Sequence, residues 1–400
     1  MRENNFFMES ADYLIAGGGC AGLSLAYYMT TTPGWEAKKI LIVDADAKNR
    51  NDRTWCFWAE TPGIFAPIVY HSWPKLRFEG KKFQTTASIF PYHYYMIQGI
   101  DFYEMMQRHL KKQPQVAFVN AKIKGFEEKD HQIYTETDKG RLESKAVFNS
   151  IIDFNFGGKI KGNHYLWQHF KGYFIKTQKP IFKKDTATFM DTSLLSDSPF
   201  QFMYVLPFSS NKALVEYTLF SENLLEDATY DAYLKDYLAQ KWQLREDNME
   251  ILAVEKAKIP MTDHLFPSTS GERLFHIGVA SGMAKPSSGY AFKRIQQQTQ
   301  AIAQNLTLGK APADIVPKLS KQFLLFDRLL LSILAQNNQE AARVFSSLFQ
   351  NNAFPKVLDF LDEKTRFFPQ NLKIMASVPP LPFLKAIFRQ NFTSIGRDYF

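Results

Sequence analysis

The first fifty residues carry the apolar and polar pattern of a strand, a helix and a second strand. Residues 11–16 form a short apolar run after polar residues, which predicts a buried parallel strand. A glycine turn follows, and then a helical stretch over residues 21–30 that the Pro33-Gly34 pair ends. Residues 40–43 are again apolar and predict the second strand. This order indicates a βαβ unit and an α/β fold class.

The pattern changes in the middle of the chain. Between about residues 166 and 264, short apolar runs predict an antiparallel sheet with one helix over about 231–242. Residues 61–95 are rich in Pro and aromatic side chains without helical periodicity, which predicts short strands and loops. The strands predicted for the antiparallel sheet are Phe174–Lys176, Thr186–Met190, Phe202–Pro207 and Ala213–Phe220.

The first pattern returns after this sheet. Leu274–Gly278 predicts another strand and Tyr290–Leu306 a helix, and beyond about residue 312 the chain is helical, apolar and rich in Phe. A chain of 400 residues suits two or three domains. We expect a discontinuous nucleotide-binding domain from residues 1–165 and 265–310, an inserted β-rich substrate domain from 166–264 with contributions from 61–95, and a helical C-terminal region from 311–400.

Composition and charge exclude some functions. Aromatic residues make up 15% of the chain, a share that suits either an aromatic core or contact with something long and apolar. The formal net charge is +8, but the basic residues are scattered, which argues against nucleic acid as a partner. Cys20 and Cys56 are too few for a disulfide framework and have no metal-ligand spacing, so we expect no metal.

No segment has the pattern of a signal peptide or a membrane-spanning helix. The start of the chain lacks a charged region followed by an apolar one. The apolar run over residues 13–29 is broken by glycines, and the run over 323–334 carries Asp327 and Arg328.

The glycine turn after the first strand has the spacing G-x-G-x-x-G. Gly17 suits a tight turn, Gly19 lets a pyrophosphate approach the backbone, and Gly22 lets helix and strand pack closely. Asp44, at the end of the second predicted strand, is placed to hold a ribose hydroxyl. In this context the motif indicates dinucleotide binding, and the alternative is a structural turn.

A second loop of small residues follows the strand at Leu274–Gly278. It contains Gly278, Gly282, Pro286 and Gly289 and precedes a helix, so its backbone N–H groups can stabilise negative charge on a flavin. The alternative is an ordinary βα loop. The two loops together indicate FAD and a Rossmann-like domain of the glutathione-reductase or hydroxylase type, interrupted by the substrate domain.

Further motifs lie along nearly the whole chain, at residues 51–58, 166–172, 202–208, 213–218, 278–290 and 326–331. With these motifs the chain resembles the bacterial flavoprotein lycopene β-cyclase family, which is related to the plant β-cyclases. Two departures from related patterns are visible. Val279 stands where many flavin hydroxylases carry Asp, and Tyr217 stands where plant cyclases carry a second Glu.

The resemblance implies an isomerase of carotenoid biosynthesis that converts lycopene through γ-carotene to β-carotene. A proton adds to a terminal double bond, a ring closes and another proton leaves, so no net redox occurs. Reduced FAD would stabilise the carbocation, with NAD(P)H as its reductant, and other acyclic carotenoids are further substrates. Glu216 lies in an apolar strand, where burial would keep it protonated as the acid. Its other interpretation is a solvent-facing Glu or a partner of Arg.

Candidate contacts to the substrate and the cofactor are aromatic and basic. Trp55, Trp58, Tyr204 and Tyr217 are candidates for lining a substrate tunnel and stabilising a cation, although for each one alone the core is the favoured interpretation. Arg53 can contact the flavin or its phosphates, or form an interdomain salt bridge.

Two other functions stay open: a flavin monooxygenase acting on an isoprenoid or aromatic substrate, and a non-catalytic prenyl-lipid carrier on the same fold. The basic, Phe-rich segment from Ala311 to Phe400 predicts peripheral association with anionic lipid at the cytoplasmic, inner face of the membrane. The alternative is that these helices cover the flavin domain. The sequence leaves the oligomeric state open.

Overall fold

The computed structural model describes residues 10–152, 163–196, 199–336, 338–364 and 368–389. Its N-terminal part is a seven-stranded sheet in the order β8-β2-β1-β11-β10-β9, with β17 paired to β11. The strands β8, β2, β1, β11 and β17 are parallel, and β9 and β10 are antiparallel. Their bounds are β1 Ser10–Ala16, β2 Ile40–Asp44, β8 Val116–Asn120, β9 Ile123–Lys129, β10 Gln132–Thr137, β11 Gly140–Asn149 and β17 Leu274–His276.

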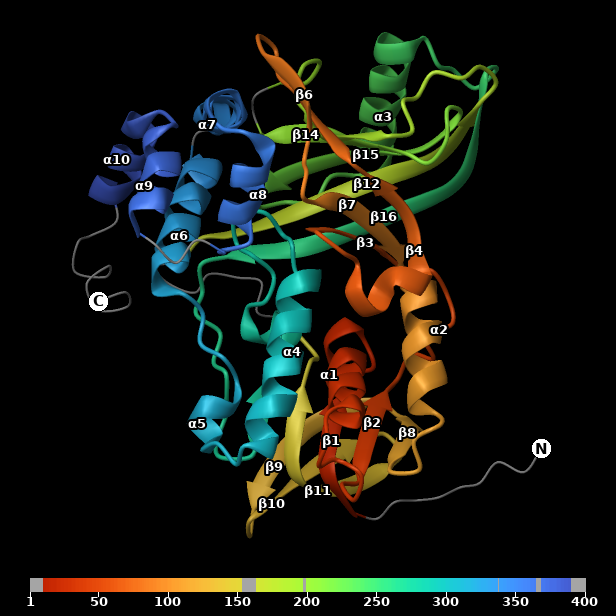
Figure 1. Ribbon diagram of the computed structural model, residues 1–400, viewed down its shortest axis with the longest axis vertical. Helices are drawn as coiled ribbons and strands as arrows, with labels where there is room; N and C mark the ends of the chain where they lie inside the picture. The colour runs from red at the N-terminus through yellow and green to blue at the C-terminus, as the bar shows by residue number, and fades with distance from the viewer. Residues whose placement is uncertain (1–9, 153–162, 197–198, 337, 365–367, 390–400) are drawn as a thin grey trace.

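Helices pack on this sheet because its strands bury both of their faces. Leu14 and Ile15 on β1 are fully buried on opposite faces of the sheet. In Figure 1, α1 (Cys20–Thr31) and α4 (Phe292–Thr307) lie side by side although they are far apart in sequence. Residues 278–307 thus return to the N-terminal unit, as the sequence pattern predicts.

The second sheet has seven strands in the order β16-β12-β15-β14-β13-β5-β6. All pairs are antiparallel except β13 with β5. Two of the strands come from the 61–95 region, so this part of the chain joins the inserted sheet. The bounds are β5 Lys75–Glu79, β6 Gln84–Ser88, β12 Tyr165–Thr177, β13 Thr186–Asp191, β14 Gln201–Pro207, β15 Lys212–Ser221 and β16 Met249–Thr262.

Smaller elements join the two sheets and cover their faces. A three-stranded sheet, β3-β7-β4, and helix α2 lie between them, and α3 covers one face of the second sheet (Figure 1). The short 3-10 helices η1 and η3 lie before β4 and after β17. The bounds are β3 Thr54–Ala59, η1 Gly63–Ile68, β4 Val69–Trp73, β7 His93–Gln98, α2 Gly99–Leu110, α3 Asp227–Trp242 and η3 Gly278–Ser281.

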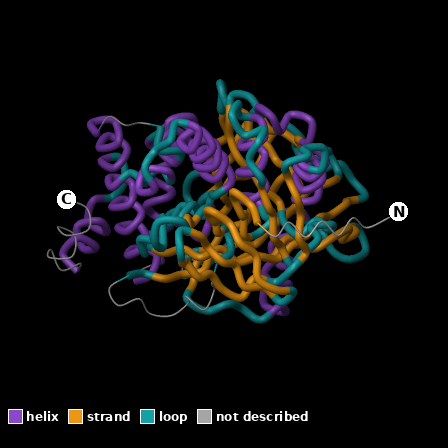
Figure 2. The backbone as a smooth tube through the Cα atoms, turned by 90° about the horizontal axis from the view of Figure 1, so that it is seen from below, coloured by secondary structure: helices purple, strands orange, loops and turns teal. Residues whose placement is uncertain are grey.

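The C-terminal region is helical, and it packs against the end of the second sheet. Figure 2 shows its helices gathered at one side of the strands. Phe349 on α7 stacks on Phe78 of β5, with ring centroids 4.7 Å apart. The bounds are α5 Pro312–Ile315, α6 Lys321–Gln336, α7 Asn338–Asn351, α8 Phe354–Leu361, α9 Phe368–Ala376 and α10 Pro380–Arg389. The predicted α/β class, with an inserted sheet and a helical C-terminal region, is confirmed.

One predicted strand is much too short. β12 runs from Tyr165 to Thr177, whereas the apolar pattern marks only residues 174–176. Polar residues interrupt the apolar pattern because each face of the strand carries a side chain with a polar environment. Gln168 faces a cleft, while Lys171 forms a 2.6 Å ion pair with Asp231 of α3 on the other face.

Candidate active site

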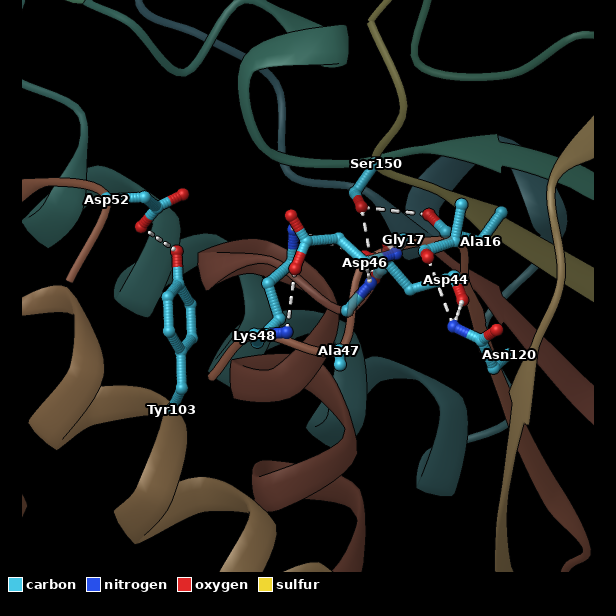
Figure 3. A network of polar contacts seen from close by, with 12 residues as sticks. Ala16, Gly17, Asp44, Asp46, Ala47, Lys48, Asp52, Tyr103, Asn120 and Ser150 are labelled. Atoms are coloured by element: carbon cyan, nitrogen blue, oxygen red, sulfur yellow. Dashed lines mark hydrogen bonds and ion pairs between the residues drawn. The ribbon is translucent and has the colours of Figure 1, made fainter. Parts of the chain in front are cut away.

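The N-terminal glycine turn has the geometry of a dinucleotide-binding loop (Figure 3). Gly17 has φ +97°, a conformation that side chains disfavour. A Cβ on Gly22 would lie 1.9 Å from the carbonyl oxygen of Gly17, so helix and turn are in direct backbone contact. A Cβ on Gly19 would meet nothing within 4 Å, which leaves its backbone open to a ligand.

Asp44 lies at the carboxyl end of β2, beside this turn. Its Oδ2 accepts a 2.6 Å hydrogen bond from the Gly18 N–H, and its Oδ1 accepts one of 2.7 Å from the Asp46 N–H. Lys48 Nζ lies 3.6 Å from Oδ2. The carboxylate is therefore fixed at the position where this fold class holds a ribose.

The second loop meets the first. Gly278 has φ +65°, and a Cβ there would lie 2.5 Å from Cβ of Ala21 in the first turn of α1. A Cβ on Gly289 would lie 2.2 Å from Oε1 of Gln168, so this end of the loop touches the second sheet. Gly282 and Pro286 line a smaller neighbouring pocket, which shares Val279 and Ala284 with the main cleft.

A cleft of about 1850 Å³ lies where the two loops face the second sheet. Gly19, Arg53 and Gly289 are among its lining residues. Two polar atoms in its wall, Gln168 Oε1 and Ser288 Oγ, are buried and have no hydrogen-bond partner among the described residues. An open glycine backbone and unpaired polar groups along one wall fit a dinucleotide with a polar ring system.

Glu216 lies on the face of the second sheet that looks into this cleft. It is directly opposite Tyr204 of β14 and Gly172 of β12, and Gly172 is directly opposite Glu255 of β16. Directly opposed residues share a face, so the four form one row across four strands. Tyr204, Glu216 and Glu255 all line the cleft.

The surroundings of Glu216 favour its neutral form. Burial, with a further contribution from the charge of Glu255, raises the pKa of Glu216 to about 8. Thr218 Oγ1 donates a 2.6 Å hydrogen bond to its Oε1 and opposes this shift only in part. The side chain is therefore a carboxylic acid at neutral pH.

A second, largely apolar cavity adjoins the cleft. It lies between the second sheet and the C-terminal helices, and aromatic and aliphatic side chains make up most of its wall. Tyr204, Ser288 and Tyr290 line both spaces, so the two meet there. Its lining includes Phe189, Phe202, Phe220, Phe323, Phe326, Phe345, Phe349, Phe360 and Phe383.

Three tyrosines mark the junction. Tyr290 OH lies 2.9 Å from Tyr94 OH and 3.0 Å from Tyr204 OH. Burial raises the pKa of all three phenols, so they stay neutral. They present aromatic faces and hydroxyl groups next to Glu216, whose charge contributes to the shifts of Tyr204 and Tyr290.

Buried ion pairs tie the second loop to the C-terminal helices. Lys285 Nζ lies 3.1 Å from Asp327 of α6 and 2.8 Å from Glu363. Arg294 of α4 lies 2.8 Å from the same glutamate. Asp327 belongs to the 326–331 motif of the sequence, and its contact holds the apolar cavity against the loop.

Of the four aromatic residues predicted to contact the substrate, two line the cleft and two do not. Trp55 and Tyr204 line the cleft, and Arg53 lines it too while forming a 2.7 Å ion pair with Asp52. Tyr217 is a correction: side chains alternate along β15, so it faces away from Glu216 and stacks on Tyr233 of α3.

The prediction that Trp58 lines the substrate tunnel is also corrected. Trp58 lies in the core behind Tyr290, with their ring centroids 4.8 Å apart, and it lines neither the cleft nor the apolar cavity. Its Nε1–H donates a hydrogen bond of 3.2 Å to the carbonyl of Leu358.

Sequence reasoning missed Glu255, Gln168, Tyr94 and Tyr290. Gln168 and Tyr290 lie inside stretches that the resemblance had marked, but nothing singled them out as site residues. Glu255 is followed directly by Lys256 and then by Lys258, charged neighbours that are typical of a solvated surface, and only its strand pairing brings it to Glu216.

Comparison with known proteins places this arrangement in context. A family model described as lycopene cyclase protein matches residues 12–388. The lycopene beta-cyclase of Pantoea ananas is 26% identical over 304 residues, which are 70% of each chain. That of Pseudescherichia vulneris is 23% identical over 396 residues, covering 94% of this chain and 96% of its own.

Solved structures share the fold. A crystal structure of a Klebsiella pneumoniae HpxO variant complexed with FAD has a TM-score of 0.63 at 12% identity, covering 92% of this chain and 99% of that one. At this identity the likeness establishes the fold alone, and the FAD belongs to that protein.

Proposed function

Because the chain belongs to the lycopene cyclase family, we propose that it converts lycopene through γ-carotene to β-carotene by acid-catalysed, non-redox cyclisation. Other acyclic carotenoids with the same end group are further substrates. The two similar proteins carry the name lycopene beta-cyclase, which supports the β-ring product.

One observation carries the proposal: a buried carboxylic acid faces the junction of a polar cleft and an apolar cavity. The apolar wall of the cavity suits a long hydrocarbon, and Tyr204 and Tyr290 lie where the cavity meets the cleft that Glu216 lines. A carboxyl group with a pKa of about 8 is protonated at neutral pH and can donate a proton to an alkene.

In the reaction Glu216 donates its proton to the terminal double bond, and the adjacent double bond attacks the resulting cation to close the ring. The faces of Tyr204 and Tyr290 stabilise the positive charge through cation–π attraction. The apolar walls exclude water, which would otherwise trap the cation as an alcohol.

FAD is the cofactor that the cleft fits. Gly17, Gly19 and Gly22 with Asp44 would hold its adenosine and pyrophosphate, and Arg53 with the 278–289 loop would hold the flavin end. When bound and reduced by NAD(P)H, FAD would supply negative charge that stabilises the cation without being consumed.

Expression in a host that accumulates lycopene tests the proposal. We expect the red pigment to be replaced by β-carotene, with γ-carotene at early times, when the extracts are separated by chromatography. Unchanged lycopene in cells that contain the folded flavoprotein would contradict the proposal. A hydroxylated or epoxidised product would instead support the monooxygenase alternative.

We further propose that the chain takes its substrate from the cytoplasmic face of an anionic membrane. None of the described helices is long and apolar enough to span a bilayer. On α10, Leu381, Leu384 and Phe388 share a face and are exposed by 58%, 47% and 77%. Phe383 of the same helix lines the apolar cavity, so this exposed face adjoins the cavity wall.

Charge supports an anionic surface as the partner. Over residues 311–400, Lys and Arg outnumber Asp and Glu by 11 to 7. Lys385 lies on the exposed side of α10, next to Leu384, and its Nζ is 3.1 Å from Oε1 of Glu340 on α7. Each cation near such a surface contributes about 1 kcal/mol of attraction, which adds to the insertion of apolar side chains.

Flotation with liposomes tests this surface. The protein should rise with anionic vesicles at low salt and partly detach at high salt, because salt screens the ionic attraction. Leu384→Ser with Phe388→Ser should reduce the floating fraction severalfold and leave the FAD content unchanged. Equal flotation of the double variant would exclude α10, and no flotation of the parent would exclude the membrane.

A further inference from the structure

We propose that Glu255 is the second acid–base residue of this site, the carboxylate that accepts the proton released when the ring double bond forms. This inference rests on the proposed cyclisation and adds to it a residue that neither the sequence motifs nor the comparisons assign.

Strand register places the two carboxyl groups together. Gly172 is the direct partner of Glu216 on one side and of Glu255 on the other. Neighbouring strands lie about 4.8 Å apart, so the two side chains start about two strand spacings from each other on one face. The residue between them has no side chain, and the gap therefore opens into the cleft that both glutamates line.

The space beside Gly172 is narrow. A Cβ on Gly172 would lie 2.8 Å from Cδ1 of Leu214 and 3.3 Å from Cβ of Glu216. A larger residue would press on both side chains and take up part of the space between the two carboxyl groups.

Thr54 fixes Glu255. Its backbone N–H donates a 2.9 Å hydrogen bond to Oε1 of Glu255, and its Oγ1 donates one of 2.6 Å to Oε2. Thr54 belongs to the motif at residues 51–58. Contact of Arg53 with the cofactor does not explain why Thr54 is part of that motif. Both oxygens are held by donors, which is how a protein orients and stabilises a carboxylate.

The two glutamates thus have different environments. Glu216 is surrounded by apolar strand and phenol rings and receives one hydroxyl hydrogen bond. Burial raises the pKa of Glu255 above its usual value, and the two hydrogen bonds from Thr54 and the charge of Arg53 oppose this shift. A pair of carboxyl groups separated in this way divides the roles of acid and base.

The step balances. Glu216 loses its proton to carbon 2 of the substrate end group, and the electrons of the neighbouring double bond form the bond between carbons 1 and 6. The positive charge then lies on carbon 5. Glu255 takes the hydrogen of carbon 6 as a proton, and that C–H electron pair becomes the ring double bond. Glu255 then releases this proton to solvent and Glu216 takes one up from solvent, which resets the site with no oxidant or reductant.

Four variants of the purified holoenzyme test the assignment on lycopene in liposomes: Glu255→Gln, Glu255→Asp, Thr54→Val and Thr54→Ser. Glu250→Gln is the matched control, because Glu250 is on the same strand and exposed. The FAD content, the rate and the position of the ring double bond are measured for each.

We expect Glu255→Gln to keep its FAD and to lose at least about 100-fold in rate, the range for removing a positioned base. Its residual product should contain rings in which the cation lost a proton from the neighbouring methylene or methyl group. Thr54→Val should lower the rate about tenfold, since one of two orienting hydrogen bonds remains. Thr54→Ser and Glu250→Gln should match the parent, and Glu255→Asp should recover part of the rate.

The outcomes separate the two claims. An active parent with Glu255→Gln within a few-fold of it overturns the role of Glu255 alone. An inactive parent overturns the cyclisation and this inference together. If Glu255→Gln loses FAD, the test rests on Thr54→Val, because this variant keeps the carboxylate of Glu255. An unchanged rate of Thr54→Val overturns the proposal. A tenfold lower rate of Thr54→Val, together with the parent's rate in Thr54→Ser, supports it.

Discussion

Replacing Glu216 with Gln should stop ring formation while the protein stays folded and keeps its FAD. The amide has nearly the same shape and can still accept the hydrogen bond from Thr218 Oγ1, but it has no acidic proton to donate. Loss of a positioned general acid costs about 10²- to 10⁴-fold in rate. The measurement is β-carotene formed per FAD by the purified variant.

The pH dependence of the parent gives a second readout of the same residue. Glu216 must be neutral to act, and its pKa is raised to about 8, so activity should hold at neutral pH and fall as the pH rises through about 8. Glu222→Gln is the control, because Glu222 follows the same strand and is exposed. Activity of Glu216→Gln within a few-fold of the parent would remove Glu216 from the mechanism.

Gly19→Val should abolish FAD retention without unfolding the protein. The space around a Cβ on Gly19 is empty within 4 Å, so the side chain is tolerated until a pyrophosphate must approach the backbone. We expect a colourless protein with at least about 100-fold weaker FAD binding, since the clash cannot be relieved without moving the turn.

The control for this variant is Gly125→Val on β9. A Cβ there also meets nothing within 4 Å, but Gly125 lies far along the sheet from the cleft. This variant should retain its flavin absorbance. A Gly19→Val protein with the same absorbance and melting temperature as the parent would show that FAD does not bind at the N-terminal turn.

Local patterns allowed much of the fold and half of the site to be predicted. The glycine spacing identified the turn because Gly17 has a positive φ and because a Cβ on Gly22 would lie 1.9 Å from the carbonyl oxygen of Gly17. Glu216 was singled out by the family resemblance, because its apolar strand alone left a solvent-facing Glu or a partner of Arg open. Tyr217 was misplaced although the strand was right, because one position along a strand changes the face.

The rest of the site depends on contacts between distant parts of the chain. Glu255 comes to Glu216 only through the pairing of β16 with β12 and of β12 with β15. Thr54 reaches Glu255 across a separation of 201 residues. The charged residues of β16 are typical of a surface strand. No local signal in the sequence shows that Glu255 faces a cleft.

The most direct test of the central claim is the mass of the product that the purified, reduced holoenzyme forms from lycopene in deuterated water. Acid-catalysed cyclisation predicts a product with the elemental composition of lycopene, one deuterium gained for each ring formed, and no stoichiometric consumption of NAD(P)H. A product heavier by one oxygen atom, with NAD(P)H consumed in equal amount, or lycopene recovered unchanged and without deuterium, would contradict the account.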